Sequence, residues 1–246
     1  MRVLALDTAT TDLVAGLAVT ANTGNTGNTA NTGNTGGAAG SRGTACEVLA
    51  ETVIPTRAHN ELLVPTITEL LEGAGLAFSD LDAIVVGCGP GPFTGLRVGM
   101  ATASALGQAL GIPVHGVVTH DAVAALVQAP TALVVTDARR REVYWARYEG
   151  GRRVAGPDVI APAKLACPPV AVWSVPEQLA DAVQVESEDV TYVAPRTAGL
   201  VAAADFSVKP GPLVPHYLRR PDATPPKPKP KSPALPDVDL AKLGEE

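Results

Sequence analysis

Residues 87–117, GCGPGPFTGLRVGMATASALGQALGIPVHGV, constrain the fold more than any other part of the chain. An apolar run over 81–86 leads into a Gly/Pro loop, and the loop leads into a long segment that ends at Gly111, with Pro113 just beyond. Glycine after a helix and proline shortly later are the usual stop signals of a helix. The stretch therefore predicts a strand, a glycine loop and a helix over 95–110, which is a building unit of an α/β sheet.

A strand, a glycine loop and a helix N-terminus often form an anion site, because free N–H groups and the helix dipole point to one spot. Here Pro90 and Pro92 have no N–H to donate. Leu96 follows Gly95, where a phosphate-binding Walker loop would need lysine. These residues favour a loop that does not itself bind phosphate.

Short apolar runs separated by turn residues predict further strands. Residues 3–6 are apolar on both faces, as in a central strand. We predict the other strands over 13–19, 47–54, 81–87, 133–136 and 142–148, and a helix over 60–76. Asp7 and Asp137 each end a strand and precede a turn and an antiparallel strand. This echo predicts an α/β fold with two related lobes.

Composition changes mark the domain boundaries. We divide the chain of 246 residues into a first α/β lobe over 1–110, a second α/β lobe over 111–220 and a tail over 221–246. An Asn-Thr-Gly repeat predicts a low-complexity hairpin loop over 21–45 within the first lobe. Alternating proline and lysine predict that the tail is extended and disordered.

The charge balance and the cysteines limit the classes of function. The net charge is −6, and the basic clusters over 139–141, 152–153 and 227–231 do not resemble an RNA-binding platform. Cys46, Cys88 and Cys167 are isolated, which suits a reducing cytoplasm. The N-terminal residues do not resemble a signal peptide, and no apolar run approaches the ~20 residues that cross a bilayer. We expect a cytoplasmic protein.

Several motifs spread along the chain resemble one family. They are GPGPFTGLRVG at 89–99, LALDTAT at 4–10, RAHNELLVP at 57–65, DARRREVYWARY at 137–148 and PHYLR at 215–219. Together they resemble the TsaB family, the dimerisation subunit of the bacterial machinery for the tRNA modification threonylcarbamoyladenosine (t6A). The resemblance implies an actin/Hsp70/sugar-kinase-like fold, with two related lobes, mixed sheets and flanking helices.

The resemblance also implies a non-catalytic role. The catalytic relative binds a metal through two histidines four residues apart, and the corresponding positions here are Thr119 and Val123. We therefore expect no catalytic residue, no metal and no cofactor. The implied function is to bind and activate the catalytic threonylcarbamoyl transferase, which modifies adenosine 37 of tRNA. Further implied partners are the ATPase subunit of the complex and, for the chain alone, a second copy. Contact with tRNA would be indirect, and no membrane is involved.

The resemblance implies that two helices associate with the same two helices of a partner as a bundle. We expect about half of the apolar and small residues on these helices to lie at the interface, and the rest to face the protein's own sheet. The candidates are Leu63, Ile67, Leu70, Leu71, Leu96, Gly99, Met100 and Ala103.

Two other functions remain open. Asp7, Thr8 and Asp137 could hold a magnesium–nucleotide, which would make the chain a nucleotide- or metal-dependent enzyme of the same fold, glycoprotease-like or a small-molecule kinase. The competing interpretation is that these aspartates cap turns. Cys88 beside the glycine loop is expected to be buried and inert. Alternatively, the protein could be an adaptor that uses its proline-rich tail as a ligand for a partner.

Overall fold

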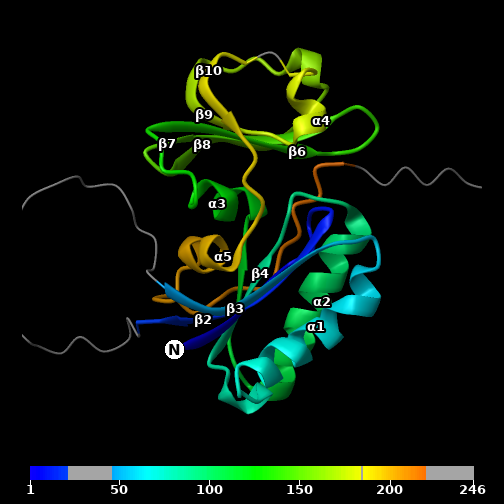
Figure 1. The fold of residues 1–246 in the computed structure, drawn as a ribbon, viewed down its shortest axis with the longest axis vertical. Helices are drawn as coiled ribbons and strands as arrows, with labels where there is room; N and C mark the ends of the chain where they lie inside the picture. The colour runs from blue at the N-terminus through cyan, green and yellow to red at the C-terminus, as the bar shows by residue number, and fades with distance from the viewer. Residues whose placement is uncertain (22–45, 184, 220–246) are drawn as a thin grey trace, which may run out of the picture.

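The computed structural model describes residues 1–21, 46–183 and 185–219, and they form two lobes that lie one above the other (Figure 1). Each lobe contains a five-stranded mixed sheet. The strand order is β3-β2-β1-β4-β5 in the first lobe and β8-β7-β6-β9-β10 in the second. The predicted 21–45 loop and 221–246 tail lie outside the described residues, apart from residue 21.

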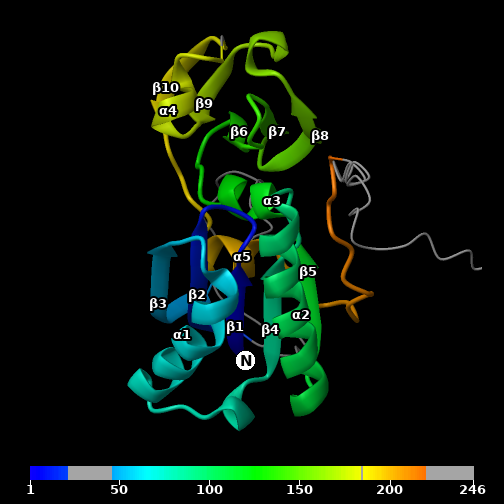
Figure 2. The same cartoon turned by 90° about the vertical axis from the view of Figure 1, so that its right-hand side faces the viewer.

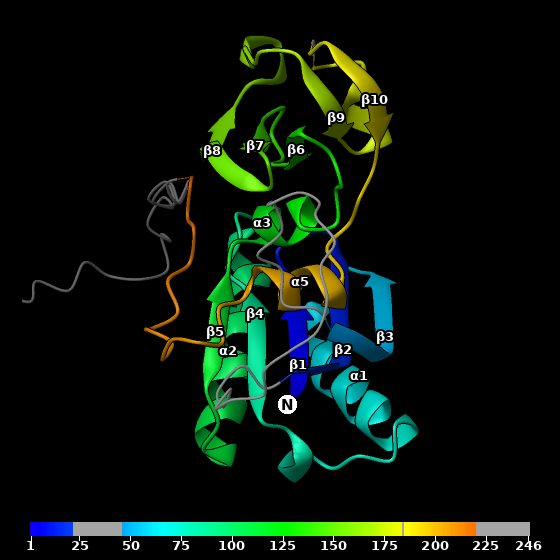
Figure 3. The same ribbon diagram turned by 90° about the vertical axis from the view of Figure 1, so that its left-hand side faces the viewer.

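The first lobe packs helices on both faces of its sheet. Its strands are β1 (Arg2–Asp7), β2 (Asp12–Thr20), β3 (Cys46–Pro55), β4 (Ala83–Gly87) and β5 (Val114–Val117). The helices α1 (His59–Gly73) and α2 (Phe93–Leu110) run side by side and cover one face (Figure 2). Helix α5 (Thr197–Ala203) covers the other face (Figure 3). The 3₁₀ turn η1 (Phe78–Asp80) precedes β4.

The second lobe repeats the strand arrangement of the first. Its strands are β6 (Thr131–Asp137), β7 (Val143–Glu149), β8 (Arg152–Ile160), β9 (Val170–Ser174) and β10 (Ser187–Thr191). In each lobe the first strand pairs antiparallel with the second and parallel with the fourth. Helix α4 (Glu177–Ala180) and the 3₁₀ turn η2 (Pro162–Lys164) belong to this lobe, and the short helix α3 (Thr119–Ala124) precedes it in the chain. The predicted α/β fold with two related lobes is confirmed by this common topology.

Strand β1 shows why the first sheet is covered on both faces. Successive side chains of a strand point to opposite faces. Leu4 and Leu6 pack into the core beneath α1 and α2, while Val3 and Ala5 pack into the core beneath α5. All four are fully buried. The run of apolar residues at 3–6, without polar alternation, therefore produces a central strand, as predicted.

The predicted lobe boundary at residue 110 does not match the sheet topology. Strand β5 lies beyond it, yet it pairs in parallel with β4 of the first sheet, with Val85 opposite His115. Helix α5, from the predicted second lobe, packs on β1, β2, β3 and β4. The chain thus enters the second lobe only after α3 and returns to the first. Sequence order alone does not reveal that β5 joins the first sheet, because its place depends on parallel pairing with β4.

Helix α2 ends as its sequence predicts. The cap residue Gly111 adopts a left-handed conformation with φ of 68°, which glycine accepts without a Cβ penalty. The predicted start at 95 is two residues late, since α2 begins at Phe93. Helix α1 keeps Pro65 in its interior, where proline removes one backbone hydrogen bond.

Candidate functional site: strand ends, glycine loop and helix pair

Asp7 lies at the end of β1 and is completely buried. Its carboxylate accepts a 2.8 Å hydrogen bond from the backbone N–H of Ala9 and a 2.7 Å bond from the hydroxyl of Thr119. The Thr119 hydroxyl in turn accepts a 3.3 Å bond from the N–H of Gly89. The carboxylate therefore ties together the β1–β2 turn, the glycine loop and the start of α3, and it offers no surface to a metal ion from solvent.

Burial raises the pKa of Asp7 from 3.8 to about 6, because desolvation outweighs the hydrogen bonds from Thr119 and Ala9. Between these two pH values the folded chain holds a proton that the unfolded chain has lost. The stability contributed by the protonated carboxyl is therefore present at low pH and is lost as the pH rises through about 6. At roughly 1.4 kcal/mol for each pH unit, ionisation of Asp7 costs the folded state about 3 kcal/mol at neutral pH.

We expect Asp7→Asn to remove this pH dependence. The difference in unfolding free energy between the variant and the parent chain should shift by up to about 3 kcal/mol in favour of the variant between pH 4 and pH 7. Urea melts at a series of pH values measure this difference. Asp189→Asn, which removes an exposed carboxylate on β10, is the control for loss of one charge. A difference that stays constant from pH 4 to pH 7 would show that Asp7 does not titrate in this range.

Asp137 repeats the local geometry of Asp7 in the second lobe. Its carboxylate accepts a 2.6 Å hydrogen bond from the backbone N–H of Arg139, again two residues on. Both aspartates thus cap a turn, which is the structural role weighed against metal binding above. Unlike Asp7, Asp137 is exposed.

Thr8 is bound to helix α2 by hydrogen bonds in both directions. Its hydroxyl donates a 2.7 Å bond to the carbonyl of Gly95 and accepts a 3.1 Å bond from the N–H of Gly99. A Cβ at Gly95 would lie 2.3 Å from the Thr8 carbonyl oxygen, and one at Gly99 would lie 2.4 Å from the Thr8 hydroxyl. The glycines of this motif therefore let α2 dock on the end of β1, which explains the motif without a bound phosphate.

The cysteine and histidines near the glycine loop lack the properties of a catalytic pair. Burial raises the pKa of the Cys88 thiol to about 12, so it is not a thiolate at neutral pH. Burial also lowers the pKa of His120 to about 3, and its Nε2 lies 3.3 Å from the hydroxyl of Thr136. Within residues 1–21, 46–183 and 185–219, no three His, Cys, Asp or Glu side chains are grouped as metal ligands.

The residues predicted to bind a partner are mostly inside the lobe. Leu63, Ile67, Leu70 and Leu71 on α1 are buried, as are Leu96, Gly99 and Ala103 on α2; only Met100 is partly exposed. Six of the eight belong to the core between the helices and the first sheet: Leu63, Ile67, Leu70, Leu71, Met100 and Ala103. The expectation that about half would lie on a free face does not fit this packing, because the strongest apolar stripe of each helix covers the sheet.

A different face of the same two helices is open to solvent. Val64 on α1 is 50% exposed, and Ala101 and Ala105 on α2 are also exposed. These residues are apolar or small, so they would allow another helix to approach closely. The sequence analysis missed them because it selected the most hydrophobic stripe. The signal that marks them in the sequence is an apolar or small residue on the outward side of each helix, where polar residues are expected. It also missed Thr119 as the partner of Asp7.

The duplicated sheets, the helices on both faces and the aspartate at each first hairpin define an actin/sugar-kinase-like protein. A solved structure, YeaZ from Pseudomonas aeruginosa, has the same fold, with a TM-score of 0.62 and 26% identity over 82% of this chain and 89% of that one. Residues 47–209 match the family model described as TsaD: tRNA N6-adenosine threonylcarbamoyltransferase. The chain belongs to the TsaB (YeaZ) family, and this membership supports a role in the biosynthesis of tRNA threonylcarbamoyladenosine.

Curated proteins are similar to the chain over different shares of its length. The tRNA threonylcarbamoyladenosine biosynthesis protein TsaB of Escherichia coli is 35% identical over 97 residues, which are 38% of this chain and 42% of that protein. An uncharacterized protein of Mycobacterium tuberculosis is 54% identical over 72% of this chain and 83% of its own length. One of Mycobacterium leprae is 51% identical over 91% of this chain, but the chain spans only 56% of the length of that relative. In the described part of the chain, no helix is long and apolar enough to cross a bilayer.

Proposed function

We propose that this protein is a non-catalytic scaffold of t6A biosynthesis, which binds the catalytic threonylcarbamoyl transferase and holds it in an active state. The observation that supports the proposal is that the side chains considered for catalysis or ligand binding make internal hydrogen bonds instead. Asp7, Thr8 and Asp137 all bond to the protein's own backbone. A chain that keeps the fold of an enzyme family but commits these groups to internal contacts is suited to binding rather than to catalysis.

The open face of α1 and α2 is the proposed contact surface. Its members are Val64, Ala101 and Ala105, which are exposed, whereas the buried stripes of the two helices cover the sheet. Small residues let two helix pairs approach closely enough to pack as a bundle. The same face would serve a homodimer of the chain alone and a heterodimer with the catalytic subunit. The ATPase subunit would then join the assembled pair, and contact with tRNA would pass through the catalytic subunit.

The test is the size of the particles in solution. Size-exclusion chromatography with light scattering on the full chain should give a homodimer. We expect it to convert to a one-to-one complex when the catalytic subunit of the same source is added, and tRNA modification should begin only with that complex. A chain that stays monomeric and ignores the catalytic subunit would contradict the proposal.

The choice of variant matters for this test. Leu70→Asp, the change that the predicted interface suggests, would place a charge at a side chain that is 8% exposed and packed in the core. It is expected to unfold the first lobe and so cannot separate association from stability. Changes on the open face avoid this difficulty.

A further inference from the structure

The last described segment of the chain, residues 205–219, connects the two lobes along the outer edge of the first sheet. This segment, the strap, follows α5 and forms no helix or strand. It runs beside β5 and ends against the turn between β6 and β7 of the second lobe (Figures 2 and 3). The strap is therefore a third connection between the lobes, in addition to the two places where the chain crosses between the sheets.

The two crossings lie together on the opposite side of the molecule (Figure 3). Residues 125–130 lead from α3 to β6, and residues 192–196 lead from β10 to α5. Helix α3 packs against α5 and against β6 and β7, and its Asp121 accepts a 2.7 Å hydrogen bond from the hydroxyl of Tyr148. Two neighbouring crossings allow rotation about the line that joins them, as in a hinge. An attachment far from that line opposes the rotation.

The strap is attached to the first lobe by one apolar side chain and one backbone hydrogen bond. Leu213 lies over Gly116 of β5, where an added Cβ would be 2.9 Å from the Cδ2 atom of the leucine. The N–H of His216 donates a 2.9 Å bond to the carbonyl of Cys88. Within the described part of the chain, this is the only backbone hydrogen bond that joins the strap to the rest of the protein. Side chains therefore hold most of the strap in place.

The strap also contacts the start of α2 through an aromatic pair. The ring centroids of Tyr217 and Phe93 lie 4.9 Å apart. The hydroxyl of Tyr217 accepts a 3.1 Å hydrogen bond from Nε of Arg97, and the guanidinium of Arg97 lies 3.8 Å from the centre of the Phe93 ring. The two aromatic residues are 40% and 45% exposed, so water reaches this contact and it is weaker than a buried one.

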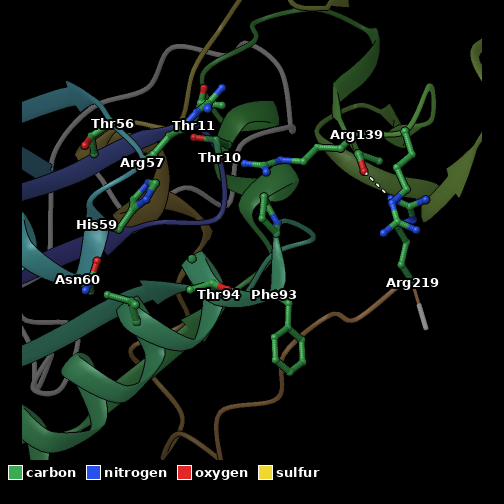
Figure 4. Close-up of a pocket in the computed structure, with 15 residues that line it drawn as sticks. Thr10, Thr11, Thr56, Arg57, His59, Asn60, Phe93, Thr94, Arg139 and Arg219 are labelled. Carbon is green, nitrogen blue, oxygen red and sulfur yellow. Dashed lines mark hydrogen bonds between the residues drawn. The ribbon is translucent and has the colours of Figure 1, made fainter. Parts of the chain in front are cut away.

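The attachment to the second lobe is an arginine at the end of the strap. Arg219 donates a 3.0 Å hydrogen bond to the carbonyl of Ala138 (Figure 4) and pairs with Glu142 at 2.8 Å. The side chains of this ion pair are 25% and 35% exposed. Arg219 also lines a cleft of about 710 Å³ between the lobes, together with Arg57 of the first lobe and Arg139 of the second. The strap thus bridges the two lobes at the border of this cleft.

We propose that the strap is a releasable clamp. While Arg219 is bound to the second lobe, the clamp fixes the angle between the lobes and the width of the cleft. When Arg219 detaches, the lobes rotate about the two crossings. Exposed ion pairs are weak and are screened by salt, and segments with few backbone hydrogen bonds open more readily than sheets. The pair of Arg219 with Glu142 is therefore the point of release. This inference does not depend on the scaffold role.

The first test measures release of the strap by amide hydrogen exchange, followed by NMR on the full chain. Arg219→Ala should accelerate exchange of the His216 amide by about tenfold, because it removes a charged hydrogen bond that holds the strap closed. The matched control is Arg2→Ala, which breaks an exposed ion pair with Asp80, at 3.7 Å, inside the first lobe. The His216 amide of this control should exchange at the rate of the parent chain.

The second test measures the distance between the lobes by electron–electron resonance between two spin labels. The labels are placed at Gln108→Cys on α2 and Glu188→Cys on β10, both exposed positions, in a full chain whose three native cysteines are replaced. We expect one narrow distance distribution with the native strap and a broad one with Arg219→Ala. Salt at about 1 M should broaden the first and leave the second unchanged.

A rescue experiment separates the clamp from a general loss of stability. Arg219→Glu combined with Glu142→Arg restores an ion pair of opposite polarity, so its distance distribution should be narrower than that of Arg219→Glu alone. Thermal melts establish that each variant is folded. If Arg219→Ala does not fold, Glu142→Gln takes its place, because it removes only the charge of the partner, and it should also broaden the distribution.

Three results would overturn the proposal. The first is an unchanged rate of His216 exchange in Arg219→Ala, which would show that this arginine does not hold the strap. The second is faster exchange with an unchanged distance distribution, which would show that the strap does not restrain the lobes. The third is equal broadening in Arg2→Ala, which would assign the effect to any lost surface ion pair.

Discussion

Gly91→Ala is expected to destabilise the folded chain by about 4 kcal/mol or more, the largest effect of any single methyl group considered for this protein. A Cβ at Gly91 would lie 2.0 Å from the carbonyl oxygen of Ala9, and 2.7 Å and 2.9 Å from its carbonyl carbon and Cα. All three atoms belong to backbone in the β1–β2 turn, which Asp7 holds by its bond to the Ala9 N–H. Because the obstacle is backbone, no change of side-chain rotamer relieves it.

Urea denaturation of the two proteins side by side measures the effect. The matched control is Gly73→Ala at the end of α1, where an added Cβ has nothing within 4 Å. Alanine there is expected to be neutral or to stabilise the chain by up to about 1 kcal/mol. If Gly91→Ala melts within about 1 kcal/mol of the parent chain, the glycine loop can move away from β1 and the close packing of the motif is not required.

Val64→Asp is expected to leave the chain folded and to weaken its association by at least about a hundredfold. Val64 is 50% exposed, so the carboxylate remains hydrated in the free protein. At a helix–helix interface the same carboxylate would lose its water without a partner charge, which costs several kcal/mol. The change therefore acts on the proposed bundle rather than on the core.

The control makes the same substitution on the other lobe. Val190 on β10 is 52% exposed, so Val190→Asp adds an equal charge at an equally open valine outside the proposed face. Light scattering should show the Val64 variant as a monomer and the Val190 variant as a dimer, and addition of the catalytic subunit should restore tRNA modification only with the latter. Equal association of the two variants would place the interface elsewhere.

The strands and long helices could be predicted because their signals are local. An apolar run such as 3–6 needs cover on both faces, and Gly111 with Pro113 ends a helix whatever surrounds it. The family could also be identified, because the motifs are short and contiguous. The role of the glycine motif could not, since it depends on Ala9 and Thr8, which are far away in sequence and are brought against it by the pairing of β1 with β4.

The sequence alone determined the α/β class, the two related lobes and the family, since periodicity, turn residues and contiguous motifs encode them. Only the tertiary structure decided what the candidate residues do. It buried Leu63 and Ile67 in the core and left Val64 open, because the sheet takes the most apolar stripe of each helix. It also bonded Asp7 to Thr119 and gathered Arg57 and Arg139 around one cleft. These results depend on contacts between residues far apart in the chain, which no local pattern records.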